Sequence, residues 1–316
     1  MDKKNEAPES FRTSIGGQAL IEGILMRGPT REAVVLRTAD GLVTKVDEPH
    51  TIRERYKLLG WPFLRGIVVF IESMVHGVKA LTYSASMLPE DQQEEPGKLD
   101  RWIEKKFGTE KAEKLLIGLA VFLGVCLSVG LFILLPTLLA GFMTNLTESS
   151  VLRNLTEGAL RIVIFLLYMS LCTRSAELKK VFGYHGAEHK TIFCYEKGLP
   201  LTVENVRVQP RFHPRCGTSF LFIVMLISIF VFSFLSWQNV WFRMAVRILL
   251  LPVVMGISYE IIHWAGKHDN WLSRGLSAPG KALQRLTTAE PDDGMIECAI
   301  EALKPVIPEE KGRDAW

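Results

Sequence analysis

The stretch between residues 115 and 143 most constrains how this 316-residue chain can fold, because it has no charged side chain over 29 consecutive positions. A helix needs about 20 apolar residues to cross the hydrocarbon core of a bilayer. Residues 115–143 therefore predict a transmembrane helix. Pro136 marks either a kink in this helix or its exit from the bilayer.

Three further apolar runs extend this pattern. Residues 219–242 also lack charge, and Trp237 and Trp241 stand where interfacial aromatic residues are common. The runs 162–173 and 248–259 have only 12 residues each, which is short for a span. They become long enough if the flanking arginines extend from the helix ends to the interface, and the alternative is two buried helices of a soluble core. These arginines are Arg161, Arg243 and Arg247.

The charges of the connections predict an orientation. Residues 174–218 carry eight Lys and Arg side chains, whereas the connection after the first span carries one arginine. Positive connections stay on the cytoplasmic side. We expect a multi-pass protein of the cytoplasmic membrane with both termini in the cytoplasm, and membrane lipid as its partner. The expected fold is mainly α: a polytopic bundle of about four transmembrane helices with a small cytoplasmic α+β N-terminal part.

The remaining segments predict smaller soluble parts. Two alternating runs around Asp40-Gly41 are typical of a β-hairpin, and residues 201–208 could add a strand. The expected domain organisation is a disordered tail (1–12), a β-rich segment (13–60), an amphipathic membrane-associated helix (61–88), a linker (89–111), a membrane domain (112–263) with the cytoplasmic connection 174–218, and a helical C-terminal segment (264–316).

Two of the predicted helices have specific features. Within residues 61–88, Arg65, Glu72 and Lys79 recur every seven positions and form a polar stripe. A helix lying on the membrane or packed against the bundle fits better than a fifth span, which would bury these charges. Near the C-terminus, Thr287 and Glu290 have capping-box spacing ahead of a helix. Its apolar face repeats at helical intervals through Ile296, Ala299, Ile300 and Leu303.

The sequence HGAEH at residues 185–189 is the strongest chemical motif of the chain. On a helix, His185 and His189 share one face and can bind one cation, while Glu188 can take a proton from water. This order, H-x-x-E-H, is that of inverzincin metalloproteases. The motif predicts a divalent metal site with zinc as the expected ion. The alternative without a metal is that His185 and His189 are polar side chains at the membrane interface.

Catalytic zinc needs a third protein ligand. Glu260 lies 71 residues beyond His189, and a glutamate on a later helix is the usual third ligand of an inverzincin. His213 and Cys216 provide another imidazole and a thiol just before residues 219–242, and both donor types suit zinc. The predicted metal ligands are therefore His185, His189, Glu260, His213 and Cys216, with Glu188 as the catalytic base.

Composition excludes other classes. The formal net charge is only +3, and we find no zinc-finger spacing or phosphate-binding loop, so no nucleic-acid partner is expected. The five cysteines are scattered and do not form a disulfide pattern.

Five separated blocks make the chain similar to the bacterial YqhQ-like membrane proteins, a family catalogued as a domain of unknown function. The blocks are GGQALIEGILMRGP, YHGAEHKTIFCYE, HPRCGTSF, ISYEI and LTTAEPDDGMIECAI, and the resemblance covers about residues 13–304. It implies a multi-spanning membrane protein with a metal-dependent activity and names no substrate. Within GMIECAI the chain departs from the family, in which a glutamine is expected before the methionine and a valine at Cys298. Neither position touches the predicted site.

These features predict a metal-dependent hydrolase that acts at the cytoplasmic membrane face on a lipid headgroup or a peptide. The alternative belongs to another class: a membrane scaffold or transporter component with a structural or ion-binding His/Cys cluster. A closed shell of four ligands would favour that alternative, because structural zinc leaves no position for water. The four are His185, His189, His213 and Cys216.

Overall fold

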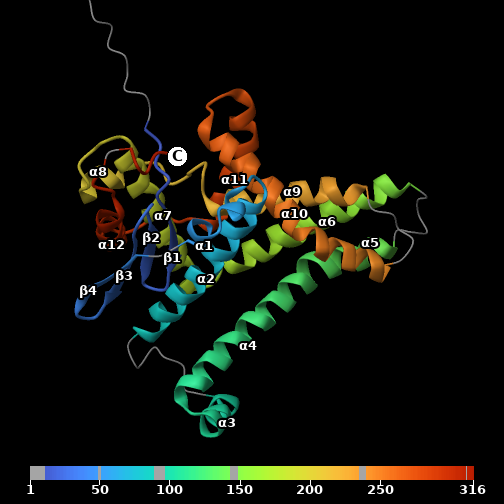
Figure 1. The fold of residues 1–316 in the computed structure, drawn as a ribbon, viewed down its shortest axis with the longest axis horizontal. Coiled ribbons are helices and arrows are strands. Elements are labelled where there is room, and N and C mark those ends of the chain that lie inside the picture. The colour runs from blue at the N-terminus through green and yellow to red at the C-terminus, as the bar shows by residue number, and fades with distance from the viewer. Residues whose placement is uncertain (1–10, 49–50, 89–96, 143–148, 235–239, 311) are drawn as a thin grey trace, which may run out of the picture. The chain divides into compact units, whose positions relative to one another are not determined.

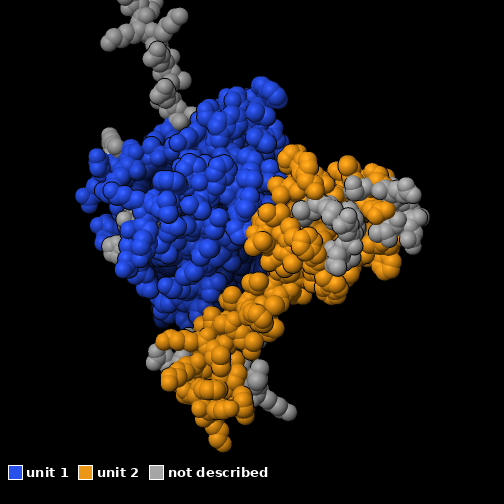
Figure 2. Space-filling model, turned by 45° about the vertical axis from the view of Figure 1, so that its right-hand side comes forward, with its two compact units in different colours: residues 1–88, 169–227, 252–316 blue, residues 89–168, 228–251 orange. Residues whose placement is uncertain are grey.

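A computed structural model describes residues 11–48, 51–88, 97–142, 149–234, 240–310 and 312–316. The chain is mainly helical, with a small sheet near the N-terminus. It divides into two compact units, each assembled from separate segments. Unit 1 contains residues 1–88, 169–227 and 252–316, and unit 2 contains residues 89–168 and 228–251 (Figure 2). The expected tail (1–12), the start of the expected linker (89–96) and Trp237 lie largely or wholly outside the described residues.

The N-terminal part of unit 1 is a four-stranded antiparallel meander. Its strands are β1 (Gly16–Leu20), β2 (Gly23–Arg27), β3 (Glu32–Thr38) and β4 (Gly41–Asp47), paired in sequence order. The β3–β4 turn confirms the hairpin predicted at Asp40-Gly41: Thr38 pairs with Gly41, whose φ of +124° suits glycine. A glycine is needed there because other side chains rarely adopt this backbone conformation.

The sheet buries side chains on both of its faces within unit 1, chiefly from β2 and β3. One face carries Ile24, Met26 and Val35 and packs against α7 (Ala176–Glu196) and α12 (Asp293–Leu303). The other face carries Leu25 and Val34 and packs against α2 (Leu64–Ser86). Alternate residues of each strand point to opposite faces, so one short sheet holds α7 on one side and α2 on the other (Figure 1).

The helices around the sheet correct two expectations. Residues 201–208 form no strand: Val203–Arg207 is the short helix α8, and the Thr202 side chain accepts a hydrogen bond from Asn205 N at its start. Thr287 ends α11 (Trp271–Thr287) instead of capping the last helix. Asp292 caps α12 by accepting from Met295 N at 2.8 Å. The predicted apolar face of α12 is buried, as expected.

The helix predicted over residues 61–88 exists as α2, but its polar stripe does not face outward as a whole: Lys79 is exposed, Arg65 is half-buried and Glu72 is buried. Glu72 is buried and accepts a hydrogen bond from Ile52 N at 2.7 Å. The residues that α2 turns inward are otherwise small, and its exposed face carries large apolar side chains, among them Ile71, Met74 and Val75. Short helical turns precede α2 (α1, Ile52–Arg55; η1, Lys57–Gly60), and η5 (Lys304–Val306) follows α12.

In unit 2 the expected linker contains a helix, α3 (Lys98–Phe107). A long helical rod follows it, made of α4 (Thr109–Val129), a π-helical segment η3 (Gly130–Leu134) and α5 (Leu135–Gly141). The π turn lies just before Pro136, which lacks the N–H that a regular α-helix needs. The rod therefore continues through the proline.

Three described helices are long and apolar enough to cross a membrane. They cover Lys114–Gly141, Val151–Cys172 and Trp241–Lys267. The two short runs thus belong to the long helices α6 (Ser150–Cys172) and α10 (Val240–Lys267). The run 219–242 is not one helix, because α9 spans only Gly217–Ser233 and α10 begins at Val240.

The arginines beside the short runs do not extend from helix ends. Arg161, Arg243 and Arg247 are buried, with exposed fractions of 7%, 1% and 1%. Arg247 pairs with Glu157 of α6. This ion pair explains why the long side chain of Arg247 turns inward among the helices.

Candidate metal centre

Three residues of unit 1 place their potential ligand atoms together. One nitrogen of His185, one nitrogen of His189 and Sγ of Cys216 all lie within 4.8 Å of one another. We call these three residues the His/Cys cluster. Two imidazole nitrogens and a thiolate are a donor set that zinc accepts. The cluster joins α7 to the segment just before α9, so it unites two of the segments that the sequence singled out.

The helix α7 sets the spacing of the two histidines. Its N-terminus is capped by Ser175, whose side chain accepts from Leu178 N, and the helix runs without interruption through HGAEH. His185 and His189 are four residues apart, and their ring centroids lie 4.4 Å from each other. Because positions i and i+4 share one face of a helix, the two rings point to the same side.

Each histidine has one ring nitrogen fixed by a backbone carbonyl. His185 Nδ1 lies 2.8 Å from Thr287 O, and His189 Nδ1 lies 2.5 Å from Arg211 O. A carbonyl oxygen only accepts hydrogen bonds, so each Nδ1 carries a proton and donates it. With Nδ1 fixed as the donor, Nε2 is the ring nitrogen that can offer a lone pair to a cation, which is the arrangement typical of metal-binding histidines.

The Nε2 atom of His189 gives the clearest test of whether the cluster fits a metal. This atom is buried and has no hydrogen-bond partner among the described residues. A buried polar atom without a partner costs about 1–3 kcal/mol unless a ligand satisfies it. Nε2 of His189 thus has the burial and the lone pair that a metal ligand needs.

The thiol of Cys216 faces His185. Sγ lies 3.1 Å from His185 Nε2 and accepts from Thr218 N at 3.5 Å. Burial opposes ionisation of this thiol, but the charges of His189 and His185 outweigh burial and hold the pKa of Cys216 well below its ordinary value. Burial likewise lowers the pKa of His185, and the facing thiolate reverses this effect, so the pKa rises to about 9. The two shifts describe a thiolate beside a protonated ring when no cation is bound.

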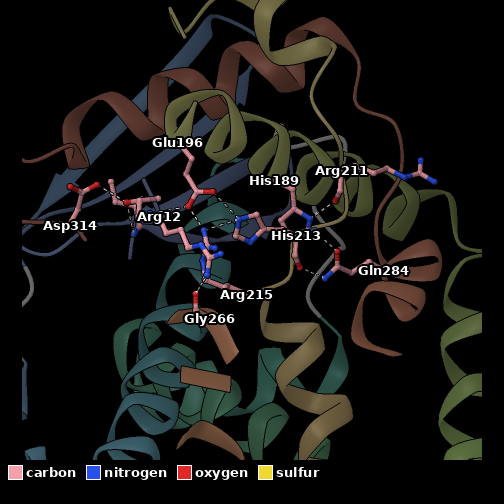
Figure 3. Close-up of polar contacts among 11 residues, drawn as sticks. Arg12, His189, Glu196, Arg211, His213, Arg215, Gly266, Gln284 and Asp314 are labelled. Atoms are coloured by element: carbon pink, nitrogen blue, oxygen red, sulfur yellow. Dashed lines mark hydrogen bonds and ion pairs between the residues drawn. The ribbon is translucent and has the colours of Figure 1, made fainter. Parts of the chain in front are cut away.

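The connection that carries Cys216 is held by α11. Gln284 of α11 accepts from His213 N and donates to His213 O, both at 2.7 Å. Figure 3 shows this pair beside the contact from His189 to Arg211. Gln284 is fully buried, so these two bonds fix the backbone between Arg211 and Cys216. One glutamine therefore helps to position two parts of the site.

Glu188 lies next to the cluster but is not one of its ligands. The carboxylate is buried, and one oxygen accepts from Gly17 N at 2.9 Å. Burial raises the pKa of Glu188, and the nearby charges of His189 and His185 partly offset this increase. A Cβ on Gly17 would meet both Leu25 O and the Glu188 carboxyl carbon, so β1 can approach α7 this closely only because a glycine stands there.

His213, a predicted ligand, is occupied by other groups. Its Nε2 lies 3.3 Å from Arg215 Nη2 and 3.7 Å from Glu196 Oε2, while Arg215 also pairs with Glu196 (Figure 3). Burial, opposed by a hydrogen bond to Glu196, lowers the pKa of His213 to about 4, so the ring is neutral. The ring is near His189, with centroids 5.6 Å apart, but it is not part of the cluster.

Glu260, the other predicted ligand, is also engaged elsewhere. Arg65 of α2 binds it through both ends of the guanidinium, with Nε 2.7 Å from Oε1. The N–H of Phe63 adds a third hydrogen bond at 3.2 Å. Glu260 is therefore a salt-bridge partner in this structure and does not complete the cluster.

Several residues that shape the site were not predicted from the sequence. The carbonyls of Thr287 and Arg211 leave no signal, because any residue supplies a backbone oxygen. Gln284 does leave a signal in the sequence, because it is a polar residue on the buried face of the amphipathic helix α11. Glu196 and Arg215 were separate charges in the sequence and form an ion pair only after folding.

Comparisons with known proteins give the chain a family. Residues 61–309 match the family described as "Protein of unknown function (DUF1385)". The chain belongs to this family. It is also 33% identical over 308 residues to the "Uncharacterized protein YqhQ" of Bacillus subtilis (strain 168), a match that covers 96% of this chain and 94% of that protein. No solved structure matches the chain. Membership of DUF1385 confirms the family resemblance drawn from the five sequence blocks and assigns no activity to the His/Cys cluster.

Proposed function

We propose that this DUF1385 protein is a membrane-bound, metal-dependent hydrolase whose centre is the His/Cys cluster. The observation that carries the proposal is the buried Nε2 of His189, which has no hydrogen-bond partner among the described residues and lies beside His185 and Cys216. These three residues would hold the ion, and zinc suits two imidazoles and a thiolate.

The number of ligands supports a catalytic site over a structural one. Catalytic zinc sites have three protein ligands and one open position, whereas structural sites have four. Nε2 of His213, the fourth ligand of a closed shell, lies 3.3 Å from Arg215 Nη2 and is already engaged there. A scaffold or transporter with a structural His/Cys site, our alternative from the sequence, is therefore the weaker proposal.

Glu188 would carry the proton in this reaction. A bound zinc ion supplies Lewis acidity at such a site. Glu188 is buried beside the cluster, and a carboxylate with a raised pKa is suited to take a proton from the attacking water and pass it to the leaving group. The N–H of Gly17 orients one carboxylate oxygen and leaves Glu188 in place during the proton transfer.

The substrate would be a bond presented at the cytoplasmic surface of the membrane, in a lipid headgroup or a peptide. Exposed apolar side chains on the long helices support insertion in a bilayer, for example Phe122, Leu127 and Leu167. The eight basic residues of 174–218, the segment that contains the cluster, support a cytoplasmic location for the site.

Metal content measured on the purified full-length protein tests the proposal. We expect about one zinc ion per chain for the wild type and loss of the ion in His189→Ala. Glu188→Gln should retain the ion, because Glu188 is not among the cluster's ligand residues. Equal zinc content in the wild type and His189→Ala would overturn the site.

A matched control comes from the same neighbourhood. His213→Gln changes a buried histidine whose ring is 5.6 Å from that of His189, but its Nε2 is already engaged. We expect this variant to keep zinc whenever it folds. The exposed His268 provides a second control, and His268→Ala should also keep zinc.

The short contact between Cys216 and His185 favours a second candidate, a metal-free thiol hydrolase. In that reaction Sγ of Cys216 would attack a carbonyl carbon and form a thioester, His185 would give its proton to the leaving group, and water would then cleave the thioester. The 3.1 Å distance between Sγ and Nε2 is within the reach of such a pair.

Alkylation of the purified protein by iodoacetamide separates the two candidates. In a metal site Cys216 is protected, and a chelator exposes it. In a thiol hydrolase Cys216 reacts rapidly without chelator, and His185→Gln slows this reaction because the thiolate loses its charged partner. The modification is read by peptide mass spectrometry, with Cys172 as the internal reference.

A further inference from the structure

Unit 2 buries a group of charges that the proposed hydrolase does not use. Arg247 of α10 binds Glu157 of α6 through two nitrogens, with Nη2 2.8 Å from Oε2. Thr137 of α5 donates to Glu157 Oε1 at 2.8 Å and accepts from Arg247 Nη1 at 2.7 Å. Arg161 of α6 adds a longer contact to Glu157 at 3.4 Å.

The charges of this group do not balance. Arg161 and Arg247, whose guanidinium groups carry a positive charge in proteins, share one carboxylate. Glu157 is the only acidic residue among the described positions of 114–168 and 228–251. Arg243, which is also buried, lies one turn before Arg247 on α10. Buried charges are costly unless an opposite charge accompanies them.

Arg161 and Arg247 also have hydrogen-bond donors without an acceptor among the described residues. The Nε atoms of Arg161 and Arg247 are buried without a hydrogen-bond partner among the described residues. Arg161 Nη1 donates to Ser228 Oγ at 2.8 Å, which holds this guanidinium at a fixed place. The two guanidinium carbons lie 5.5 and 5.2 Å from the ring centroid of Phe232. An aromatic face attracts cations but does not neutralise a full charge.

We propose that the arginines of unit 2 bind a phosphate group. The anion site would be formed by Arg161 and Arg247. Planar guanidinium donors match the oxygens of phosphate, and a phosphate would supply both the missing negative charge and acceptors for the unpaired Nε atoms. The phosphate belongs either to a membrane lipid headgroup or to free inorganic phosphate. This site is independent of the His/Cys cluster, since all of its residues belong to unit 2.

Thermal unfolding of the detergent-purified full-length protein tests the anion site. Inorganic phosphate is titrated against chloride at equal ionic strength, and phosphatidylglycerol is compared with phosphatidylcholine in the same detergent. We expect Tm to rise by about 5 °C at a hundredfold excess of the bound anion over its Kd. A rise with phosphatidylglycerol alone assigns the phosphate to a lipid, and a rise with inorganic phosphate alone assigns it to the free ion.

Variants decide whether the effect comes from this site. Arg161→Gln should remove the Tm shift, while Arg174→Gln, which changes an exposed arginine after α6, should leave it unchanged. The proposal is overturned if neither probe shifts the wild-type Tm, or if folded Arg161→Gln responds as the wild type does.

A second variant covers the case in which Arg161→Gln does not fold. Glu157→Gln removes the carboxylate that competes with an added anion, so it should bind the effective probe at least fivefold more tightly than the wild type. Glu157→Gln should also be less stable than the wild type, and added phosphate should restore part of that stability. An apparent Kd equal to or weaker than that of the wild type would contradict an anion site between these arginines.

Discussion

At the scale of single residues, the site depends on atoms that are not themselves ligands. The carbonyls of Thr287 and Arg211 determine which nitrogen of each histidine is free. The carbonyl of Ala289, two residues after Thr287, packs against Gly186, and Ala289 N donates to Phe182 O at 2.8 Å. Gly186 therefore allows the chain between α11 and α12 to lie directly on α7.

Substitution of Gly186 tests this contact. In Gly186→Ala the new Cβ would collide with Ala289 O, so we expect a loss of about 1–3 kcal/mol in the free energy of unfolding and weaker zinc binding. Gly275→Ala is the matched control, because a Cβ at this position of α11 meets nothing within 4 Å. That variant should gain up to about 1 kcal/mol in helix propensity. Urea unfolding measures both, and equal stability of Gly186→Ala and the wild type would refute the contact.

Prediction from the sequence reached the residues of the cluster but not their environment. His185 and His189 are detectable because helical spacing puts them on one face, and Cys216 because zinc accepts a thiol beside imidazoles. Glu260 was placed with them because its position in the chain suits a third ligand. Arg65, which engages Glu260, is 195 residues away in sequence, and no local pattern announces that pair.

At the scale of secondary-structure elements, α7 supplies the histidines and α11 positions the segment that returns with Cys216. Gln284 makes the decisive link, since both of its bonds to His213 are buried. The helix α9 begins directly after Cys216, so the fixed backbone before it also fixes the first turn of an apolar helix.

Replacement of Gln284 by methionine tests the role of α11. Gln284→Met leaves a buried N–H and a buried carbonyl of His213 without partners, so the free energy of unfolding should fall by about 2–4 kcal/mol. Zinc affinity should fall about tenfold or more, because the segment that carries Cys216 loses its support. Competition with a zinc chelator measures the affinity. Arg285→Met, at the exposed neighbouring position, should change neither quantity appreciably.

Element boundaries were predictable where the local sequence sets them. They were missed where contacts between residues distant in sequence set them. The hairpin at Asp40-Gly41 follows from turn chemistry alone. The run 219–242 was expected to be one span because charge-free sequence does not reveal that α9 ends at Ser233. Glu157 and Arg161 have i,i+4 spacing, but they were excluded from the apolar run 162–173 and their burial went unrecognised.

At the scale of the whole molecule, each unit is built from segments that are distant in sequence. Unit 1 combines the N-terminal sheet with α7 and the C-terminal helices, so the predicted linear order of domains does not describe its packing. A linear list of segments does not show this packing, because sequence periodicity shows which face is apolar but not which partner covers it. Length and hydropathy, by contrast, were enough to predict long apolar helices.

Fractionation of cells that produce the protein tests membrane insertion. We expect the chain to remain in the membrane pellet after alkaline carbonate and to be released by detergent, because three long helices expose apolar side chains. In a cysteine-free background with Lys179→Cys, an impermeant thiol reagent should label the protein only after the cells are permeabilised. Release by carbonate would contradict insertion, and labelling of intact cells would contradict the cytoplasmic orientation.

X-ray absorption at the zinc edge of the zinc-loaded, full-length protein tests the central claim most directly. If His185, His189 and Cys216 bind one ion, the zinc neighbours will include nitrogen at about 2.0–2.1 Å and one sulfur at about 2.3 Å. Cys216→Ser should lose the sulfur contribution and keep the nitrogen. A spectrum of the wild type with oxygen and nitrogen neighbours and no sulfur, or a protein that takes up no zinc, would contradict the account.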